Sequence, residues 1–240
     1  MRLVFISNYF NHHQKPLCDA LAAQTVFSFL ETEEMPPQRR ELGWSVVRPD
    51  YVTRDPSVLA DADVVMAGSA PEKLVRSCIL QGKLVFRYHE RPLKAGNTAW
   101  KYLPRLVRWH WRNPHSGKVW LLCAGSKVAQ DYAKFGLFQG KALKWGYFPE
   151  SGPVAEAVPR SILWVGRLID WKHPDAALRL ARRLREDGMD FQMEIVGTGL
   201  MEAPLREQIH RDGLEGCVRL TGAVPVAQVR QKMATAAVCG

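Results

Sequence analysis

Residues 162–188 read ILWVGRLIDWKHPDAALRLARRLREDG. The apolar run at 162–166 has the length and composition of a buried strand, and Gly166 at its end allows a tight turn of the backbone. Pro174 stands at the first position of the helix that follows, where proline is tolerated. That helix has apolar residues at helical spacing and ends at Gly188, a common residue just beyond a helix. The stretch therefore predicts a strand, a loop and a helix.

Two cations lie in the predicted loop. Arg167 follows the strand directly, and Lys172 comes five residues later, beside the start of the helix. A helix N-terminus has backbone N–H groups without partners and the positive end of the helix dipole, so it favours an anion at the carboxyl end of a parallel strand. A diphosphate would fit there. The alternative is that both are solvated loop cations, neutralised by Asp170.

Short apolar runs of the same kind recur along the chain. They are rich in Val, Ile, Leu and Phe and do not alternate with polar residues, which is typical of strands buried on both faces of a parallel sheet. Amphipathic helix patterns lie between many of them. The runs are at 3–7, 25–30, 63–68, 83–88, 119–125, 162–166, 193–197 and 218–222, and the helix patterns at 14–23, 72–81, 129–135, 175–186 and 226–234. We predict an α/β protein with doubly wound parallel sheets.

A domain boundary is predicted where proline and glycine break regular structure, at 146–161. We expect an N-terminal domain at 1–150, a hinge at 151–160 and a second domain at 161–240. The second domain has about three predicted strands, and residues 236–239 read as the start of a further apolar strand. We therefore expect the chain to end inside its second domain.

Composition and charge limit the class of protein. Of 240 residues, 47% are hydrophobic and 24% are charged, which excludes a disordered or low-complexity chain. Lys and Arg number 33 against 24 Asp and Glu, a formal net charge of +9, so we expect an acidic partner: phosphates, anionic lipid or nucleic acid. Five scattered cysteines, no signal-peptide pattern and no spanning apolar stretch predict a cytoplasmic protein, on a membrane surface at most.

The motif of the second domain resembles a known family. The pattern VGRL-x3-K-x-P-helix is similar to the motif that opens the C-terminal domain of retaining glycosyltransferases with the GT-B fold, the "group 1" family. Two later stretches resemble that family's following strands, loops and helices, MEIVGTGLMEAPLREQI at 193–209 and VRLTGAVPVAQVRQKMATA at 218–236. A weaker similarity extends to the N-terminal half, at 6–21, 121–136 and 141–149.

This resemblance implies two Rossmann-like domains that face a cleft, with a nucleotide-sugar donor bound mainly by the C-terminal one and an acceptor mainly by the N-terminal one. It implies that Gly166, Arg167 and Lys172 bind the donor diphosphate. Fixed cations suit this role because negative charge builds on the diphosphate as its bond to the sugar breaks. The loop near the nucleotide matches Gly197, Thr198 and Gly199. By itself, a G-x-G more often marks a plain turn.

His89 closes the predicted strand at 83–88 and resembles the histidine that many members place beside the reacting sugar. As the catalytic candidate, it could hydrogen-bond a sugar hydroxyl or stabilise an oxocarbenium-like transition state. A lone histidine is more often structural. Glu90 is a further candidate, which either orients the His89 ring or pairs with Arg87 or Arg91.

Three polar residues at the start of the first predicted helix are candidates for the acceptor side of the cleft. They are Asn11, His12 and His13. The alternative for Asn11 is a helix N-cap, a position that asparagine favours.

The family's pair of glutamates, separated by seven residues, binds the donor sugar and ribose, and it is not identifiable in this chain. Three pairs have that spacing, Glu186 with Glu194, Glu194 with Glu202, and Glu207 with Glu215. The family places its pair after a later strand, so this spacing alone is chance. We expect the donor site of these 240 residues to be incomplete.

Most of the excess charge lies between residues 85 and 120. Eight basic residues face one acid, a balance of +7, and four of the eight tryptophans lie in the same window. A helix that begins or kinks near Pro104 would carry a basic stripe beside an aromatic and apolar one, which suits an anionic membrane surface. The candidates are Lys101, Arg105, Arg108, Arg112, Trp109 and Trp111. The alternatives are a helix that packs its apolar stripe on its own domain, and nucleic-acid binding, which no motif supports.

The sequence thus predicts an enzyme, a retaining glycosyltransferase of hexosyl type that moves a sugar from a nucleoside diphosphate sugar to a glycan or lipid-linked acceptor in cell-surface polysaccharide synthesis. The family generally works without a metal, so neither a metal nor another cofactor is expected. We expect the protein in the cytoplasm, with peripheral contact to the inner face of the membrane, and no nucleic-acid partner. The rival interpretation is a non-catalytic, basic membrane-surface or nucleotide-binding module that acts with a partner.

Overall fold

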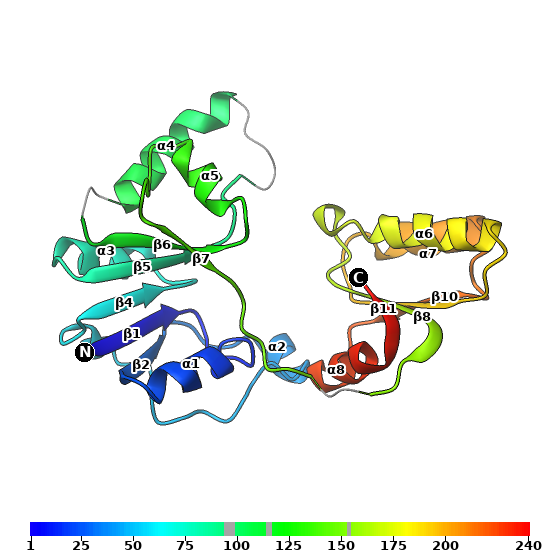
Figure 1. Cartoon of the computed structure of the whole chain (residues 1–240), viewed down its shortest axis with the longest axis horizontal. Helices are drawn as coiled ribbons and strands as arrows, with labels where there is room; N and C mark the ends of the chain where they lie inside the picture. The colour runs from blue at the N-terminus through cyan, green and yellow to red at the C-terminus, as the bar shows by residue number, and fades with distance from the viewer. Residues whose placement is uncertain (94–98, 114–116, 153–154) are drawn as a thin grey trace. The chain divides into compact units, whose positions relative to one another are not determined.

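The computed structural model describes residues 1–93, 99–113, 117–152 and 155–240. In the helix that begins at residue 99, side chains are described from residue 103 on. The chain divides into two compact units, each with its own parallel sheet (Figure 1). Unit 1 comprises Met1–Pro36 and Ser45–Glu150, and the smaller unit 2 comprises Pro37–Trp44 and Ser151–Gly240.

Unit 1 is built on a seven-stranded sheet in the order β3-β2-β1-β4-β5-β6-β7, in which every pair of neighbours is parallel. Because β1 pairs with both β2 and β4, the strand order reverses at β1, as in doubly wound folds. The strands are β1 (Arg2–Ser7), β2 (Val26–Glu31), β3 (Val52–Thr53), β4 (Val64–Ala67), β5 (Leu84–His89), β6 (Val119–Ala124) and β7 (Ala142–Trp145). The helices are α1 (Lys15–Ala22), the 3-10 turn η1 (Pro56–Leu59), α3 (Glu72–Leu80), α4 (Ala99–Arg112) and α5 (Val128–Ala133).

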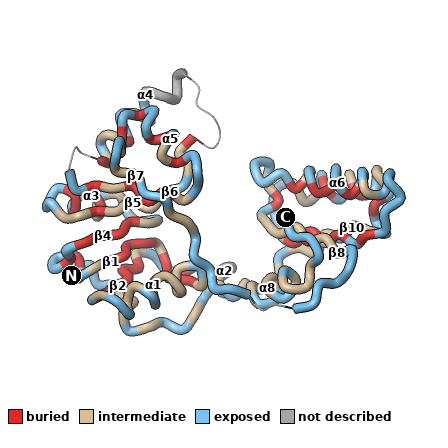
Figure 2. The backbone as a smooth tube through the Cα atoms, in the orientation of Figure 1, coloured by how far each residue is buried: buried red, intermediate tan, exposed pale blue. Residues whose placement is uncertain are grey.

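Both faces of the unit 1 sheet are buried, which explains why its strands read as continuous apolar runs. Successive residues of β1 enter different core clusters: Val4 and Ile6 pack with residues of α3, whereas Phe5 packs with Phe29 and with Cys18 of α1. Figure 2 shows buried residues concentrated along these strands. The predicted α/β class with parallel sheets is confirmed.

Unit 2 has a four-stranded parallel sheet in the order β10-β9-β8-β11. Its strands are β8 (Val158–Val165), β9 (Gln192–Val196), β10 (Val218–Gly222) and β11 (Ala236–Cys239). Its helices are α2 (Pro37–Glu41), the 3-10 turn η2 (Asp170–Lys172), α6 (Pro174–Glu186), α7 (Glu202–Arg211) and α8 (Val226–Thr235). One core cluster joins α6 and α7 to this sheet. The apolar run predicted at 236–239 is therefore a strand, paired with β8.

A short segment far from the rest of unit 2 in sequence belongs to it. Residues 37–44 carry α2, and the carbonyl of Leu42 accepts a hydrogen bond of 2.9 Å from the backbone N–H of Val226, at the start of α8. The sequence analysis gave no indication of this placement, because a single backbone hydrogen bond between distant segments leaves no pattern in composition or periodicity.

Helix α4 is anchored on unit 1 by a buried ion network. Arg87 of β5 is 1% exposed. Its guanidinium lies 2.5 Å from a carboxylate oxygen of Glu72 on α3 and 2.5 Å from the carbonyl oxygen of Arg112. The Arg112 side chain lies 3.4 Å from the other Glu72 oxygen. Helix α4 does not begin at Pro104, because it runs from Ala99 to Arg112 with Pro104 inside it, and the alternative of a kink at Pro104 stays a prediction.

Candidate functional site

The loops that follow β8 and β9 lie against each other, backbone to backbone. The N–H of Leu168 donates to the carbonyl of Thr198 at 2.9 Å, and the N–H of Met201 donates to the carbonyl of Leu168 at 3.0 Å. The N–H of Gly166 donates to Val196 at 3.0 Å. The structure therefore brings together two stretches that the sequence analysis singled out separately, 166–172 and 197–199. We call these two loops the loop pair.

Glycine is required on the second loop of the loop pair. A Cβ on Gly197 would overlap the carbonyl oxygen of Gly166, and a Cβ on Gly199 would overlap that of Leu168. Their φ angles, +144° and +159°, are also ones that side chains disfavour. The G-x-G is thus more than a plain turn, because it allows close approach of a neighbouring backbone.

The two predicted diphosphate ligands, Arg167 and Lys172, are exposed. Among the described residues, neither side chain has a hydrogen bond or an ion pair, and Asp170 does not lie within ion-pair distance of either. The alternative in which Asp170 neutralises them is therefore not the arrangement found. Two uncompensated cations at one loop are suited to an anion.

Helix α6 begins directly after this loop. Its first residue is Pro174, which is buried, and the preceding His173 has a left-handed backbone with φ +51°. No side chain caps this N-terminus. Its uncapped end adds the positive end of a helix dipole to the charges of Arg167 and Lys172.

Two apolar side chains border the loop pair and are exposed. Trp171 in η2 is 63% exposed, and Leu200, just after Gly199, is 92% exposed. Sequence reasoning missed them, although a tryptophan between two charged residues in a loop is a visible signal. Exposed aromatic and aliphatic groups beside uncompensated cations can contact the flat and charged parts of one ligand.

His89 ends β5, as predicted, but its ring packs between helices. The ring centroid lies 5.5 Å from that of Trp109 on α4 and 5.9 Å from that of Tyr132 on α5. Burial, with added repulsion from Arg87 and Arg112, lowers the pKa of His89 to about 3. Its Nε2 atom is buried without a partner among the described residues. This neutral, packed ring fits the structural interpretation, and the catalytic role stays a prediction.

Glu90 lies at the edge of the same strand and accepts a hydrogen bond from the hydroxyl of Tyr147. The two arginines proposed as its partners have carboxylates elsewhere. Arg87 binds Glu72, and Arg91 lies 2.9 Å from Asp131.

Asn11 is buried and organises the turn before α1. Its side-chain oxygen accepts from the N–H of His13 at 2.9 Å, and its carbonyl accepts from Gln14 and Lys15. This is an Asx turn, close to the predicted capping role. His12 and His13 stack with ring centroids 3.9 Å apart, and His13 is exposed. Their acceptor role stays a prediction.

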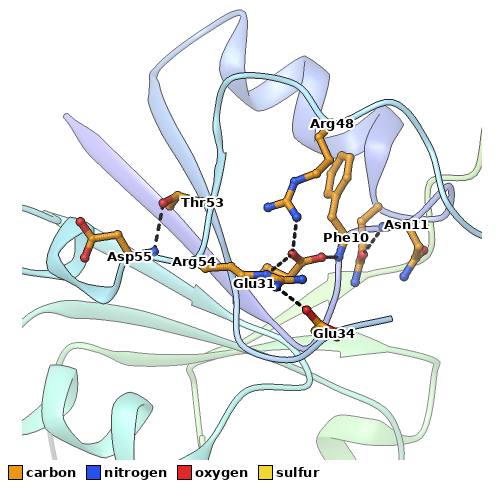
Figure 3. Close-up of polar contacts among 9 residues, drawn as sticks. Phe10, Asn11, Glu31, Glu34, Arg48, Thr53, Arg54 and Asp55 are labelled. Carbon is orange, nitrogen blue, oxygen red and sulfur yellow. Dashed lines mark hydrogen bonds and ion pairs between the residues drawn. The ribbon is translucent and has the colours of Figure 1, made fainter. Parts of the chain in front are cut away.

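A buried carboxylate beside this turn was not found from the sequence. Glu31 ends β2 and is 6% exposed. It accepts from the N–H of Phe10 at 2.9 Å, and its second oxygen lies 2.8 Å from Arg48 and 3.0 Å from Arg54 (Figure 3). Glu31 therefore holds the loop after β1 in place, next to Asn11. A glutamate that closes an apolar strand was the available signal.

Among the described candidates around α4, Trp109 is buried and Arg112 is paired with Glu72. Trp109 is 7% exposed and packs against Tyr132 at 5.0 Å, so it cannot contact a membrane, and this candidate was wrong. Trp111 is 50% exposed, as a surface role requires. Arg105, Arg108 and Arg112 lie in the described part of α4, whereas the side chain of Lys101 lies outside the described residues.

The remaining expectations concern metals, membranes and glutamate pairs. In the described part of the chain, no group of three or more His, Cys, Asp or Glu side chains is arranged to hold a metal ion. No helix among the described residues combines the length and apolar character that crossing a bilayer needs.

Glu194, a member of two of the glutamate pairs with the family's spacing, is held by cations of its own unit. It lies 2.7 Å from Lys232 and 3.0 Å from Arg219. Although burial opposes it, hydrogen bonds from Lys232 and Thr221 hold the pKa of Glu194 below its usual value.

The comparisons with known proteins agree on unit 2. Residues 159–239 match the family described as "Glycosyl transferases group 1". The chain is 36% identical over 73 residues to the amylovoran biosynthesis glycosyltransferase AmsK of Erwinia amylovora, a match covering 30% of this chain and 18% of the relative. It is 36% identical over 76 residues to the putative colanic acid biosynthesis glycosyltransferase WcaL of Escherichia coli K12, covering 32% and 19%. These matches thus span less than a fifth of the curated relatives.

A solved structure extends the likeness to the whole chain at the level of fold. The apo form of the lipopolysaccharide outer core galactosyltransferase WaaB aligns with 100% of this chain and 73% of its own, with a TM-score of 0.59 and 12% identity. The predicted pair of Rossmann-like parallel-sheet units therefore matches a GT-B glycosyltransferase structure.

Proposed function

We propose that this protein is a glycosyltransferase that takes a sugar from a nucleoside diphosphate donor and passes it, with retention, to a glycan or lipid-linked acceptor in cell-surface polysaccharide synthesis. Support comes from the family match over 159–239 and from two relatives named as glycosyltransferases of amylovoran and colanic acid biosynthesis. The observation that carries the proposal is the loop pair, where Arg167 and Lys172 are exposed without a carboxylate partner among the described residues.

The chemistry of this site follows from charge. When the bond between the anomeric carbon and the diphosphate breaks, negative charge grows on the leaving oxygen. Arg167 can bind two oxygens at once through its planar guanidinium, and Lys172 adds a compact point charge. Both lie in the loop that leads into the uncapped N-terminus of α6, with Lys172 two residues before its first residue. We propose that these cations carry out the charge stabilisation for which other enzymes use a divalent metal, so that no cofactor is needed.

The nucleotide would lie over the second loop of the loop pair. Glycines at 197 and 199 leave backbone in place of side chains on that surface, and Trp171 and Leu200 border it with exposed apolar area. Flat bases bind well to exposed aromatic and aliphatic surface. We propose that the acceptor uses unit 1, near His12, His13 and Glu90.

Calorimetric titration with UDP tests the donor site without knowledge of the acceptor. We expect Arg167→Ala and Lys172→Ala each to weaken UDP affinity by more than about fivefold, the loss of a charge-assisted contact of more than about 1 kcal/mol. Addition of EDTA leaves the affinity of the unaltered protein unchanged. The matched control is Arg182→Ala, which removes an exposed α6 cation that pairs with Glu186. If Arg167→Ala binds UDP like the control, Arg167 does not belong to the site.

A further inference from the structure

Helix α4 turns an apolar stripe away from unit 1. Leu103, Val107 and Trp111 follow one another at intervals of four residues and are 64%, 63% and 50% exposed. The opposite side of the helix is the packed one, because Trp109 is buried and Leu106 packs against the same core cluster. The alternative that α4 packs its Leu103, Val107 and Trp111 stripe on its own domain is therefore not the arrangement found.

The stripe continues onto α3. Leu80 is 66% exposed, and a shallow groove of about 410 Å³ lies between its helix and Trp111. The groove is lined by Lys73, Arg76, Ser77, Leu80, Gln81 and Trp111. Exposed apolar side chains from two neighbouring helices thus form one surface, which we call the α3/α4 surface. Contiguous exposed apolar area of this kind marks an interaction site.

Cations lie on both helices of the α3/α4 surface, and within the described part of the chain Lys73, Arg76 and Arg108 have no ion pair with an acid. Lys73 and Arg108 are exposed, and the guanidinium of Arg76 lies 4.9 Å from the Trp111 ring centroid. Helix α4 contains no Asp or Glu, and the acid on α3, Glu72, is already bound to Arg87 and Arg112. A partner for this surface must therefore supply both apolar contacts and negative charge.

We propose that the α3/α4 surface binds to the headgroup region of an anionic lipid membrane. Lipid supplies an apolar layer beneath a negatively charged one, which matches aliphatic side chains and an interfacial tryptophan flanked by Lys and Arg. Each basic residue near an anionic bilayer contributes about 1 kcal/mol. The aliphatic residues Leu103, Val107 and Leu80 favour lipid over nucleic acid, whose bases stack on aromatic groups. The proposal stands on α3 and α4 alone and does not depend on the donor site.

Flotation with liposomes tests the proposal in the complete chain. We expect recovery with vesicles of phosphatidylcholine mixed with phosphatidylglycerol and much less with phosphatidylcholine alone. Lys73→Gln with Arg108→Gln removes two cations and should weaken binding about thirtyfold, at about 1 kcal/mol for each. Leu103→Ser with Val107→Ser removes two exposed apolar side chains and should weaken binding at least about tenfold. Both sites are exposed, so these variants should retain their folds and their UDP affinity.

Matched controls carry the same chemistry elsewhere on the chain. Arg182→Gln with Arg183→Gln removes two exposed cations from α6, and Leu180→Ser with Met189→Ser removes two apolar side chains that are 45% and 58% exposed. Equal recovery with neutral and anionic vesicles, or equal losses in test and control variants, would overturn the proposal. So would binding of a single-stranded oligonucleotide that depends on Lys73 and Arg108 while vesicles fail to bind.

Discussion

Helices α4 and α6 have similar lengths and are both rich in arginine, yet they use their apolar residues differently. Helix α6 buries Ala177, Leu178 and Ala181 in the core of unit 2. Helix α4 buries Trp109 in the core of unit 1 and exposes Leu103 and its neighbours one and two turns on. An amphipathic pattern in the sequence therefore predicts that a helix has an apolar side, and it does not fix which side faces the core.

Helices α4 and α6 also differ in how their charged side chains are paired. Three of the four arginines of α6 lie within ion-pair distance of an acid one turn away, Arg179 with Asp175, Arg182 with Glu186, and Arg183 with Asp187 at the C-cap. Helix α4 has no acid of its own, and its link to Glu72 reaches across to α3. Most arginines of α6 are therefore compensated locally, whereas the exposed Arg108 of α4 has no acid on its own helix. Three substitutions or titrations sharpen this contrast.

The largest effect is expected where α4 is anchored. Glu72→Gln leaves the Arg87 guanidinium buried without its counter-ion, and an uncompensated buried charge costs about 3 kcal/mol or more of unfolding free energy. Urea unfolding followed by circular dichroism measures it. On α6, Glu186→Gln breaks a surface pair and should change stability by about 0.5 kcal/mol or less. Similar losses for the two variants would contradict the contrast between a buried anchor and surface pairs.

The second loop of the loop pair, which leads from β9 into α7, gives the next effect. Gly197→Ala places a Cβ on the Gly166 carbonyl at a φ of +144°, so we expect a loss of about 1 to 3 kcal/mol in stability together with weaker UDP binding. Gly216→Ala is the control, because its Cβ would meet open space at an ordinary φ. If Gly197→Ala has the UDP affinity and melting temperature of the unaltered protein, the close contact between Gly197 and the Gly166 carbonyl does not require glycine.

The smallest effect comes from the histidine packed beneath α4. The folded-state pKa of His89 is about 3, so the unfolded chain, with an ordinary pKa near 6.5, binds a proton that the folded chain rejects. Stability contributed by His89 therefore falls as the pH drops below about 6.5, by about 1 kcal/mol between pH 7 and pH 5.5. Unfolding measured across this range should show a shallower slope in His89→Asn. Equal slopes in the unaltered protein and in His89→Asn would contradict the lowered pKa of His89.

Much of the architecture was predictable because it depends on local pattern. The apolar runs at 162–166 and 193–197 each overlap a strand, β8 and β9, and extend one residue beyond its end. Pro174 is the first residue of α6, a position that proline tolerates. The candidate residues of the two loops were predicted separately. Their contact follows from the parallel pairing of β8 with β9, which places the ends of neighbouring strands at one edge of the sheet.

The rest depended on contacts between residues distant in sequence. Glu31 becomes a buried anchor only because β3 and the segment before it bring Arg48 and Arg54 to the end of β2. Trp109 and Trp111 stand two residues apart and look equivalent in composition, but the helical repeat turns one into the core and the other outward. Neither outcome can be obtained from residue type without the register of the neighbouring elements.

Because Gly197 and Gly199 have no side chains, the two loops of the loop pair contact each other through their backbones, and this limits how the loops can move. Because the backbones of the two loops are in direct contact, the first loop cannot shift without moving the second, and the loop that carries Arg167 and Lys172 moves together with the glycine loop. Trp171 and Leu200, both solvent-facing at its rim, are free of that constraint. In the proposed donor site, exchanging Trp171 and Leu200 would therefore change the donor preference without altering the contact between the two loops.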